Sequence, residues 1–334
     1  MVSMKDIAAK CGVSVATVSK ALNDHSDISD ETKKFISDTA REMGYFPNSS
    51  ARALKTKRTY NLGVLFVDRG HSGLTHDYFA RVLDSLKKHA EGSGYDITFI
   101  NAAVQGNMTY LEHSRYRGVD GVVIACVEFS DPNVIELINS DLPVVTIDHV
   151  FNNRISVVSD NIGGMRDLIR FIYESGHRKI AYIYGDNTSV TQNRLSSYFN
   201  TLKSFGIEAR DEYVLESQYR NPEKAAELTK QLLSLKDRPT CILYPDDYSS
   251  IGGLNANSEM GLSVTGDVSI AGYDGLYVSQ IIDPKVTTYR QDTEEIGRIA
   301  AEQIIKLIED PRSTLLEKFV VPGEVLPGGS VATV

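Results

Sequence analysis

The chain has 334 residues, 42% of them hydrophobic, and its 35 Lys and Arg against 44 Asp and Glu give a formal net charge of −9. This length suits two or three domains, and this composition excludes a disordered chain. No apolar run reaches the ~18 residues that span a bilayer, and the three cysteines lie far apart. We therefore expect a cytoplasmic protein without a secretory leader, a membrane span, a disulfide framework or a cysteine-based zinc site.

The net charge is distributed unevenly along the chain. Residues 1–60 contain 10 Lys and Arg and 7 Asp and Glu, a net charge of +3. The remainder contains 25 basic and 37 acidic residues, a net charge of −12. A small basic segment therefore precedes a large acidic one, and the overall acidity does not exclude nucleic acid as a partner of the first segment.

Three short helices are predicted in the first 45 residues. Ser3-Met4-Lys5-Asp6 reads as a capping box that opens a helix ending at Cys11-Gly12. Ser14 caps a second helix over Val15–Leu22, and Ser29 opens a third that Gly44 closes. The apolar stripe of the third helix is Phe35, Ile36, Thr39, Ala40 and Met43. The pattern predicts a helix-turn-helix, and the alternative is a small helical bundle that binds protein or nothing.

Two stretches of this segment resemble the lactose/galactose repressor family of bacterial transcriptional regulators. The first is Met4-Lys5-Asp6-Ile7-Ala8 followed by Gly12-Val13-Ser14-Val15-Ala16-Thr17-Val18-Ser19-Lys20-Ala21-Leu22-Asn23. The second is Gly44-Tyr45-Phe46-Pro47-Asn48 followed by Ala51-Arg52-Ala53-Leu54. The resemblance implies a DNA-binding domain over residues 1–47, a hinge over 48–60 and an effector-binding and dimerisation domain over 61–334.

The resemblance also implies which side chains of the second helix contact DNA. Val15 and Ala16 lie where the family reads base edges, and they could contact thymine methyl groups without a side-chain hydrogen bond. Lys20 lies where many members have Arg, so it can reach guanine acceptors without the two-pronged fork. The implied phosphate contacts, for which helix capping is the alternative role, are Ser14, Thr17, Ser19 and Asn23.

Residues 48–58 are basic and contain helix-forming Ala and Leu, and alone they would form a solvated linker. The resemblance implies a hinge helix that orders on operator DNA. In such a helix, Leu54 from each subunit of a dimer is an apolar wedge in the minor groove. The neighbouring residues expected at the DNA are Asn48, Arg52 and Lys55. A contact between Leu54 and the rest of the chain is the alternative.

From residue 61 the pattern alternates between short apolar runs and amphipathic stretches. Strands are predicted over 61–67, 95–100, 120–125 and 143–147, with helices over 78–91, 108–115 and 132–140. The rhythm restarts at Lys179, with strands over 179–184, 213–215, 240–244 and 267–272 and helices over 191–205, 222–235, 248–260 and 293–309. Such alternation predicts parallel sheets covered on both faces.

The fold class that follows is an all-α helix-turn-helix head and an α/β body. The body has two doubly wound lobes, as in a periplasmic sugar-binding protein. Residues 119–124, 176–181, 267–274 and 287–291 resemble the effector domain of the same repressor family. We expect the first lobe over about 61–160 and 290–316, and the second over about 161–289 and 317–330.

Polar side chains follow the predicted strands where ligands of such sheets bind, outside the carboxyl ends. Asp148, Asp246 and Asp274 each end a strand, and Arg194 lies near the start of a helix. Carboxylates and a guanidinium can hydrogen-bond pairs of sugar hydroxyls. The resemblance assigns these four residues to the effector site, and capping of the next helix is the alternative role of each carboxylate. Asp247 is expected to be a cap or a structural partner.

Four further residues complete the predicted effector site. Tyr219 falls where family members place an aromatic ring over the sugar, and the chain has no Trp that could replace it. His71, Ser72 and Phe79 are expected to line the first-lobe side. A metal pair at His71 and His76 is not favoured, because the seven histidines are scattered, and we expect no metal and no cofactor.

No motif of a common enzyme class is present. The chain lacks a G-x-S-x-G elbow, a G-x-G-x-x-G after the first strand, a P-loop and an H-E-x-x-H motif. The resemblance to the repressor family instead implies a homodimeric, sequence-specific transcriptional repressor that binds a roughly palindromic operator and responds to a small effector, a sugar or sugar derivative. The alternatives are a sugar-binding module whose head binds DNA non-specifically or binds protein, and, third, a glycoside hydrolase.

Overall fold

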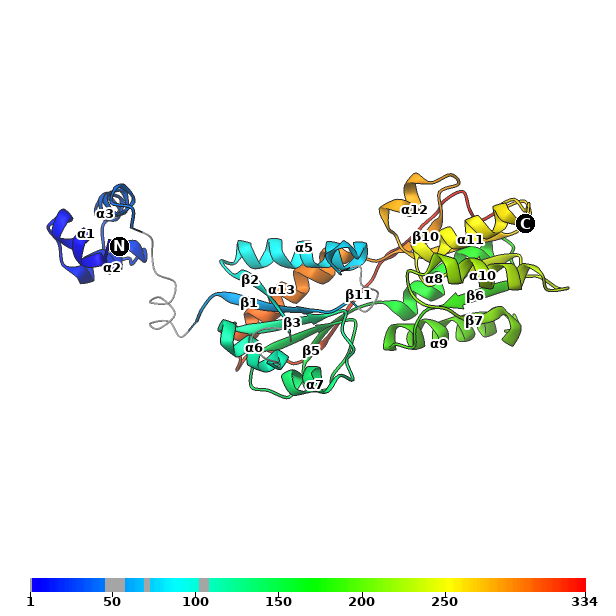
Figure 1. Cartoon of the computed structure of the whole chain (residues 1–334), viewed down its shortest axis with the longest axis horizontal. Coiled ribbons are helices and arrows are strands. Elements are labelled where there is room, and N and C mark those ends of the chain that lie inside the picture. The colour runs from blue at the N-terminus through cyan, green and yellow to red at the C-terminus, as the bar shows by residue number, and fades with distance from the viewer. Residues whose placement is uncertain (1, 46–57, 69–72, 102–107) are drawn as a thin grey trace. The chain divides into compact units, whose positions relative to one another are not determined.

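The computed structural model describes residues 2–45, 58–68, 73–101 and 108–334. The chain forms two compact units, Met1–Thr59 and Tyr60–Val334, here called the head and the body (Figure 1). Each unit has hydrophobic clusters of its own. Within the described residues, no helix combines the length and the apolar character that a membrane crossing requires.

The head contains the three predicted helices, α1 (Met4–Cys11), α2 (Val15–Leu22) and α3 (Asp30–Glu42). Serine side chains cap the N-termini of all three helices, and the predicted capping box at the start of α1 is present. The turn between α1 and α2 begins at Gly12, whose φ of 70° lies in the left-handed region that glycine adopts without strain. The helix-turn-helix prediction is therefore confirmed.

The core of the head draws on all three helices, with Ile7, Val18 and Ile36 fully buried. The stripe predicted for α3 is wrong at one position, because Phe35 is 54% exposed. The buried face of this helix instead carries Ile36, Thr39 and Ala40, which follow the spacing of three and four residues that keeps side chains on one face.

The first lobe of the body is built on a six-stranded sheet in the order β11-β5-β4-β3-β1-β2, and every neighbouring pair is parallel. Its strands are β1 (Asn61–Phe66), β2 (Asp96–Ile100), β3 (Gly121–Ala125), β4 (Val144–Ile147), β5 (Ile155–Ser159) and β11 (Lys318–Val321). One face is covered by α5 (Asp77–Gly92) and α13 (Thr293–Glu309), and the other by α6 (Tyr110–Arg117) and α7 (Pro132–Ile138).

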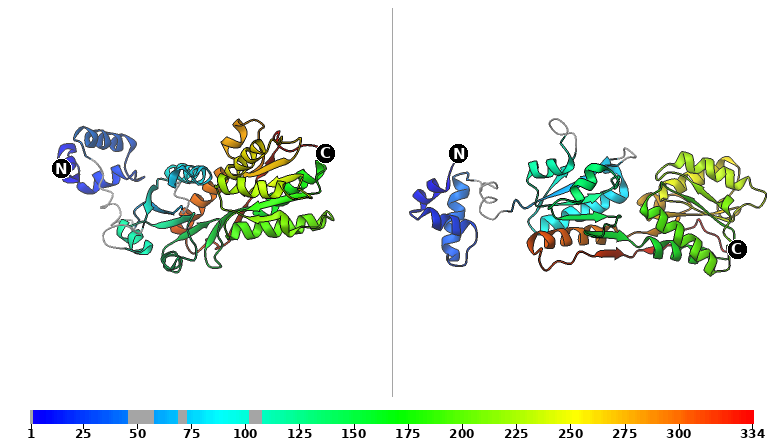
Figure 2. Two further views of the ribbon diagram at one scale, coloured as in Figure 1. Left: turned by 45° about the vertical axis from the view of Figure 1, so that its right-hand side comes forward. Right: turned by 90° about the horizontal axis from the view of Figure 1, so that it is seen from below.

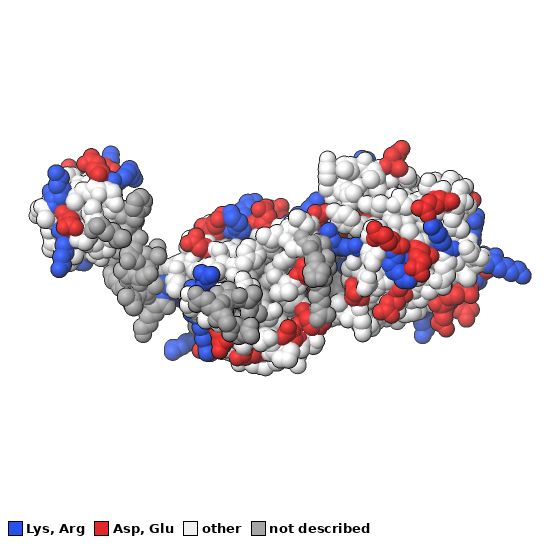
Figure 3. All heavy atoms as spheres, in the orientation of Figure 1, with Lys and Arg blue, Asp and Glu red and all other residues white. Residues whose placement is uncertain are grey.

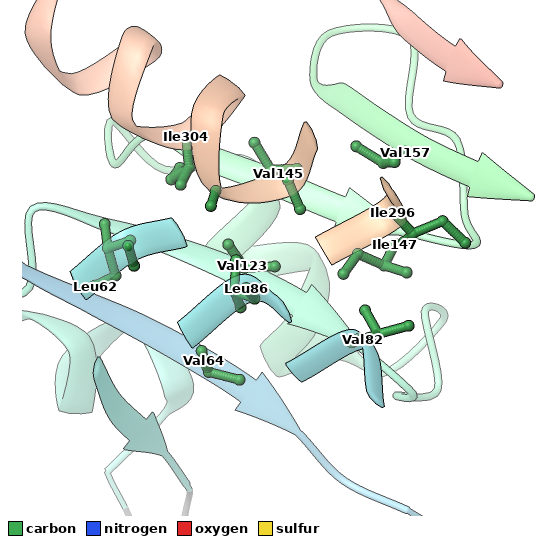
Figure 4. Packing of buried hydrophobic residues seen from close by; sticks show 14 of the residues in the cluster. Leu62, Val64, Val82, Leu86, Val123, Val145, Ile147, Val157, Ile296 and Ile304 are labelled. Carbon is green, nitrogen blue, oxygen red and sulfur yellow. The ribbon is translucent and has the colours of Figure 1, made fainter. Parts of the chain in front are cut away.

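Figure 4 shows how α5 and α13 close over this sheet. Val82 and Leu86 of α5 and Ile296 of α13 meet Val123 of β3 and Ile147 of β4, and all five side chains are fully buried. The two helices lie far apart in the sequence, so this core joins α13 to strands from the first half of the chain.

The second lobe is built on another six-stranded sheet, in the order β12-β10-β9-β8-β6-β7. Its strands are β6 (Ile180–Tyr184), β7 (Val214–Glu216), β8 (Cys241–Leu243), β9 (Ser269–Asp274), β10 (Thr287–Arg290) and β12 (Glu324–Leu326), of which only β12 pairs antiparallel. The helices α8 (Asn161–Glu174) and α9 (Ser189–Ser204) cover one face, and α10 (Pro222–Leu233) and α11 (Asp247–Glu259) cover the other (Figure 2). The described part of the body also contains three short helices: η1 (Gly73–Thr75), η2 (Asp211–Tyr213) and α12 (Tyr277–Ile281).

The chain passes between the two sheets three times, after β5, after β10 and after β11. The first two crossings follow Ser159 and Arg290. Because β11 pairs with β5 in the first sheet, the third crossing follows Val321 in place of the predicted boundary at residues 316–317. The sequence also predicted no element between 147 and 179, where the structure has β5 and α8. The two-lobed fold class is confirmed.

Candidate DNA-binding and effector sites

The exposed face of α2 carries the residues expected to contact bases. Val18 and Ala21 are buried in the head core, which leaves Val15, Ala16 and Lys20 exposed. Figure 3 shows Lys and Arg side chains alongside Asp and Glu side chains on the visible face of the head. The outer face of α2 is thus apolar at its start, at Val15 and Ala16, and positively charged near its end, at Lys20.

The residues expected to contact phosphates also have local roles in the head. The Ser14 Oγ accepts a hydrogen bond of 3.0 Å from the Thr17 amide, so the capping alternative holds for Ser14. The Asn23 Nδ2 donates to the Ser19 carbonyl at 2.7 Å. Ser14 and Asn23 are exposed, whereas Thr17 and Ser19 are half-buried.

Six of the predicted site residues lie outside the described residues. Four belong to the expected hinge and two to the expected effector site: Asn48, Arg52, Leu54, Lys55, His71 and Ser72.

In the body, Arg194 is the buried centre of the candidate effector site. It lies on α9, which follows β6, and its side chain is 3% exposed. Its Nε donates to the Asn161 side chain at 2.8 Å, and one terminal nitrogen donates to the Pro245 carbonyl at 2.9 Å. The guanidinium lies 3.6 Å from the centre of the Tyr273 ring, and its other terminal nitrogen is 3.9 Å from Asp274. These contacts fix the orientation of the guanidinium.

Asp274, the last residue of β9, is the carboxylate next to Arg194. Its Oδ1 accepts a hydrogen bond of 2.7 Å from the Gln291 side chain. Burial raises the pKa of Asp274 to about 7, because the lowering effect of Arg194 is opposed by the nearby Asp246 and Asp148 carboxylates. Asp274 thus changes its charge near neutral pH.

Asp148 follows β4 and belongs to the first lobe. Its carboxylate accepts hydrogen bonds from the Tyr78 hydroxyl at 2.9 Å and from the Ser159 amide at 3.3 Å. Burial raises the pKa of Asp148, and Arg194 acts in the opposite direction. The charge of Arg194 in the second lobe therefore reaches a carboxylate of the first.

Asp246 and its neighbour Asp247 have different roles. Asp246 caps α11 by accepting from the Ser249 amide at 2.8 Å, and it also accepts from the Arg220 amide at 2.8 Å. The capping alternative thus holds for Asp246. Of the two roles expected for Asp247, a cap or a structural partner, it does not have that of the cap. Asp247 is instead the structural partner that accepts from the Leu276 amide at 2.6 Å.

The two aromatic residues of the predicted site differ in their surroundings. The Tyr219 hydroxyl pairs with Thr191 at 2.8 Å, and its ring lies so close to Gly185 that a Cβ there would approach it to 2.6 Å. Phe79 makes ring contacts with Phe66 at 5.6 Å and with His76 at 5.0 Å. Tyr219 influences the pKa of Arg194, whereas no contact joins Phe79 to that group in the described residues.

The structure therefore brings together five of the predicted residues: Asp148, Arg194, Tyr219, Asp246 and Asp274. It adds residues that the sequence analysis missed, of which Tyr78, Asn161 and Gln291 hold these groups directly. No local motif signals their roles, because each pairs with a residue at least 17 positions away.

Two of these site residues have an unusual backbone conformation. Asp148 and Asp274 have φ values of 60° and 100°, in the left-handed region that residues other than glycine rarely adopt. Such strain persists where the surrounding structure enforces it, and it is concentrated at functional sites.

Direct hydrogen bonds also join the two lobes. The Tyr248 hydroxyl of α11 donates to Asp77 of α5 at 2.5 Å, and the Ser189 hydroxyl of α9 donates to the Asp148 carbonyl at 3.2 Å. A groove next to the first contact is lined by Asp77, Ala80, Arg81, Tyr248, Tyr277, Val278 and Ile281. Among the described residues, no group of His, Cys, Asp and Glu has a geometry that could hold a metal ion.

A helix-turn-helix head joined to a two-lobed body of this kind defines a class of DNA-binding regulators. Residues 3–48 match the model of "Bacterial regulatory proteins, lacI family", and residues 169–331 match that of a periplasmic binding protein-like domain. The chain is 30% identical to the transcriptional repressor PurR of Edwardsiella ictaluri over 323 residues, which are 93% of this chain and 92% of the relative. It is 28% identical to the probable transcriptional repressor ExuR of Bacillus subtilis, over 99% and 98% of the two chains.

Solved structures agree in fold. A lac repressor dimer bound to operator and the anti-inducer ONPF superposes with a TM-score of 0.84, at 23% identity and with 99% of both chains covered. A LacI family regulator from Enterococcus faecium with bound ribose superposes with a TM-score of 0.71, at 24% identity, covering 82% of this chain and 99% of the other. The chain belongs to the LacI family of bacterial regulatory proteins. It is a DNA-binding transcriptional regulator and not an enzyme.

Proposed function

We propose that this protein is a homodimeric repressor that binds a roughly palindromic operator. A sugar or sugar derivative lowers or raises its affinity for that operator. One observation supports the effector-binding part of this proposal. The oriented guanidinium of Arg194 interacts electrostatically with Asp148 of the first lobe and with Asp274 of the second. Carboxylates and a guanidinium in fixed positions can hydrogen-bond adjacent hydroxyl groups of a sugar. A ligand held by both lobes stabilises one lobe arrangement over others, which is the requirement for a ligand-driven switch.

The domain organisation that we propose has three parts: a DNA-binding domain over residues 1–47, a hinge over 48–60 and an effector and dimerisation domain over 61–334. The boundary between the head and the body at Thr59 and Tyr60 supports this division. In the DNA-binding domain, the outer face of α2 enters the major groove. DNA as the partner also supports a cytoplasmic location.

The sugar effector is tested by thermal unfolding of the full chain with a panel of sugars and sugar phosphates. We expect a concentration-dependent rise in melting temperature with one chemical group of sugars. The same sugars must change binding to an operator selected from random DNA. Equal affinity for the selected and random sequences would favour the sugar-binding module with a non-specific head.

The hinge is tested with Leu54→Ala. We expect weaker binding to the selected operator and an unchanged thermal shift with the sugar, because the variant lacks the wedge but keeps the body. Binding to random DNA, which does not use the wedge, should change little. Unchanged operator affinity would contradict the role proposed for Leu54.

A further inference from the structure

The exposed face of α2 ends in an ion pair that neither the cap nor the core of the helix requires. The Lys20 ammonium donates to the Oδ2 atom of Asp27, which lies in the segment between α2 and α3. Both side chains are about half exposed, 47% for Lys20 and 52% for Asp27. Exposed pairs of this kind contribute little to stability. A structural role therefore does not account for a carboxylate on the surface that approaches DNA.

The neighbouring charges show that this pairing is selective. Asp24 lies in the same segment, three residues before Asp27, and it pairs with Lys33 of α3 at 2.7 Å. Hydrogen bonding to Lys20 lowers the pKa of Asp27, so Asp27 is ionised at neutral pH. Lys20 therefore has a negative partner beside it, whereas an unpaired lysine would be free to contact any phosphate or base.

We propose that Lys20 and Asp27 act as one unit that reads a G·C base pair in the major groove; this inference rests on the proposed role of α2 in DNA binding. An ammonium group has three donors, so Lys20 can keep its bond to Asp27 and still donate to guanine N7 and O6. The carboxylate has a second oxygen, which can accept from the amino group of the paired cytosine.

The order of groups on the base-pair edge gives the unit its selectivity. Across the major groove, a G·C pair presents acceptor, acceptor and donor in that order, whereas an A·T pair presents acceptor, donor and acceptor. On an A·T pair, the ammonium would face the adenine amino group and the carboxylate would face thymine O4. Both contacts are repulsive. Asp27 thus supplies the discrimination that a lysine, without the planar fork of an arginine, does not supply alone.

Loss of the carboxylate should have two opposite effects on DNA binding. Asp27→Asn removes a negative charge near the DNA, so affinity for random sequences should rise. It also leaves Lys20 free to donate to any acceptor, so the preference at one base pair of each half-site should fall by about tenfold or more. A residue with a purely structural role would lower the affinity for all sequences together.

The experiment is selection of binding sites from randomised duplex DNA with the full-length chain, followed by titration of single-base variants of the selected site. The control is Asp24→Asn, which makes the same charge change in the same segment without touching Lys20. We expect the wild-type protein and Asp24→Asn to select a G·C pair at one position of each half-site. Asp27→Asn should lose that preference alone, and Lys20→Ala combined with Asp27→Asn should lose no more than Lys20→Ala.

Two outcomes separate the failure of this inference from the failure of the proposed function. If Asp27→Asn selects the same operator with the same G·C preference, the unit does not exist, although the protein remains a specific DNA-binding regulator. If the wild-type protein selects no sequence, the proposed operator recognition fails and this inference fails with it. Melting curves of each variant exclude loss of the folded head as the cause.

Discussion

At the scale of single residues, the candidate effector site consists of charges whose positions the protein has already fixed. Arg194 uses an amide side chain, a backbone carbonyl and an aromatic face, and it keeps a terminal nitrogen near Asp274. Burial alone would lower the pKa of Arg194, but Tyr219, Tyr273 and Asp274 raise it above its usual value. The guanidinium is therefore charged at every pH at which the protein is folded.

Arg194→Lys should abolish the thermal shift by the effector and leave operator binding intact. A lysine keeps the charge but cannot form the planar contacts with Asn161 and Pro245 while also reaching a ligand. The control is Arg178→Lys, since Arg178 also lies over a tyrosine ring, at 3.8 Å, but is exposed. A normal thermal shift in Arg194→Lys would show that this residue does not bind the effector.

The carboxyl of Asp274 predicts how stability depends on pH. Its pKa is about 7 in the folded chain, against an ordinary value of 3.8, so the folded state holds the proton more tightly. The stabilising effect of this proton is complete below the ordinary value and is lost as the pH rises to about 7. At about 1.4 kcal/mol per pKa unit, the loss is at most about 4 kcal/mol.

Asp274→Asn should therefore unfold at a higher denaturant concentration than the wild type above pH 7, and the advantage should shrink as the pH falls. Chemical denaturation at a series of pH values measures the difference between the two proteins, so that shifts of other groups cancel. Asp141→Asn is the control, because hydrogen bonding to Arg115 lowers the pKa of Asp141. If the stability difference between Asp274→Asn and the wild type did not change with pH, Asp274 would be ionised at every pH in the series.

At the scale of helices and strands, the sequence predicted a helix well where it contained both a capping residue and a regular apolar stripe. The limits of α2 and α13 match the prediction, since each has a capping side chain and a regular apolar stripe. The helix α8 was missed because Gly163 and Gly164 lower its helix propensity. Its apolar face packs on the second sheet, and this tertiary contact outweighs the weak local preference.

The residues of the candidate site could be predicted from the sequence only in part. Residues at strand ends, such as Asp148 and Asp274, follow from the positions of the strands. Their partners do not, because the pairing of Arg194 with Asn161 or of Asp274 with Gln291 depends on which strands become neighbours. The position of β11 in the first sheet is of the same kind, since a four-residue strand carries no mark of the sheet that it joins.

The close contact of α8 with the second sheet predicts the effect of adding one methyl group at a glycine of this helix. A Cβ at Gly164 would lie 2.4 Å from the Tyr273 hydroxyl and 2.5 Å from the Tyr289 ring. Gly164→Ala should thus destabilise the body by about 1–3 kcal/mol, and it should weaken effector binding because Tyr273 supports Arg194. Chemical denaturation and the thermal shift measure the two effects.

Gly92→Ala is the matched control for this substitution. Gly92 is the last residue of α5, and a Cβ there meets no atom within 4 Å. This variant should keep or slightly exceed the wild-type stability, because alanine favours the helix. If both variants behave alike, the close approach of α8 to the sheet is not a constraint on stability.

At the scale of the whole molecule, the separation of charge assigns different tasks to the two units. The residues before 61 carry a net charge of +3 and the rest a net charge of −12. DNA repels the acidic body and attracts the head only weakly. One head therefore gives little affinity, and specific binding requires two heads held together by a dimer of the bodies.

We expect the contact between the two bodies of the dimer to include the exposed surface of α12. Tyr277 and Ile281 are 68% and 60% exposed, and they border the groove that Ala80 of α5 and Tyr248 of α11 also line. Large apolar side chains on such a groove are typical of surfaces that a second copy covers. We expect the wild-type chain to have twice its own mass of 36.9 kDa in solution.

Tyr277→Asp combined with Ile281→Asp should give a folded monomer, because both side chains are exposed and a charge there costs the single chain little. Light scattering should then report one chain mass. Operator binding should fall steeply, since each half-site would bind alone, while the thermal shift with the effector should persist. Leu315→Asp, at a side chain that is 71% exposed and outside the groove, should remain dimeric. A dimer that survives the double substitution would place the contact between subunits on another face of the body.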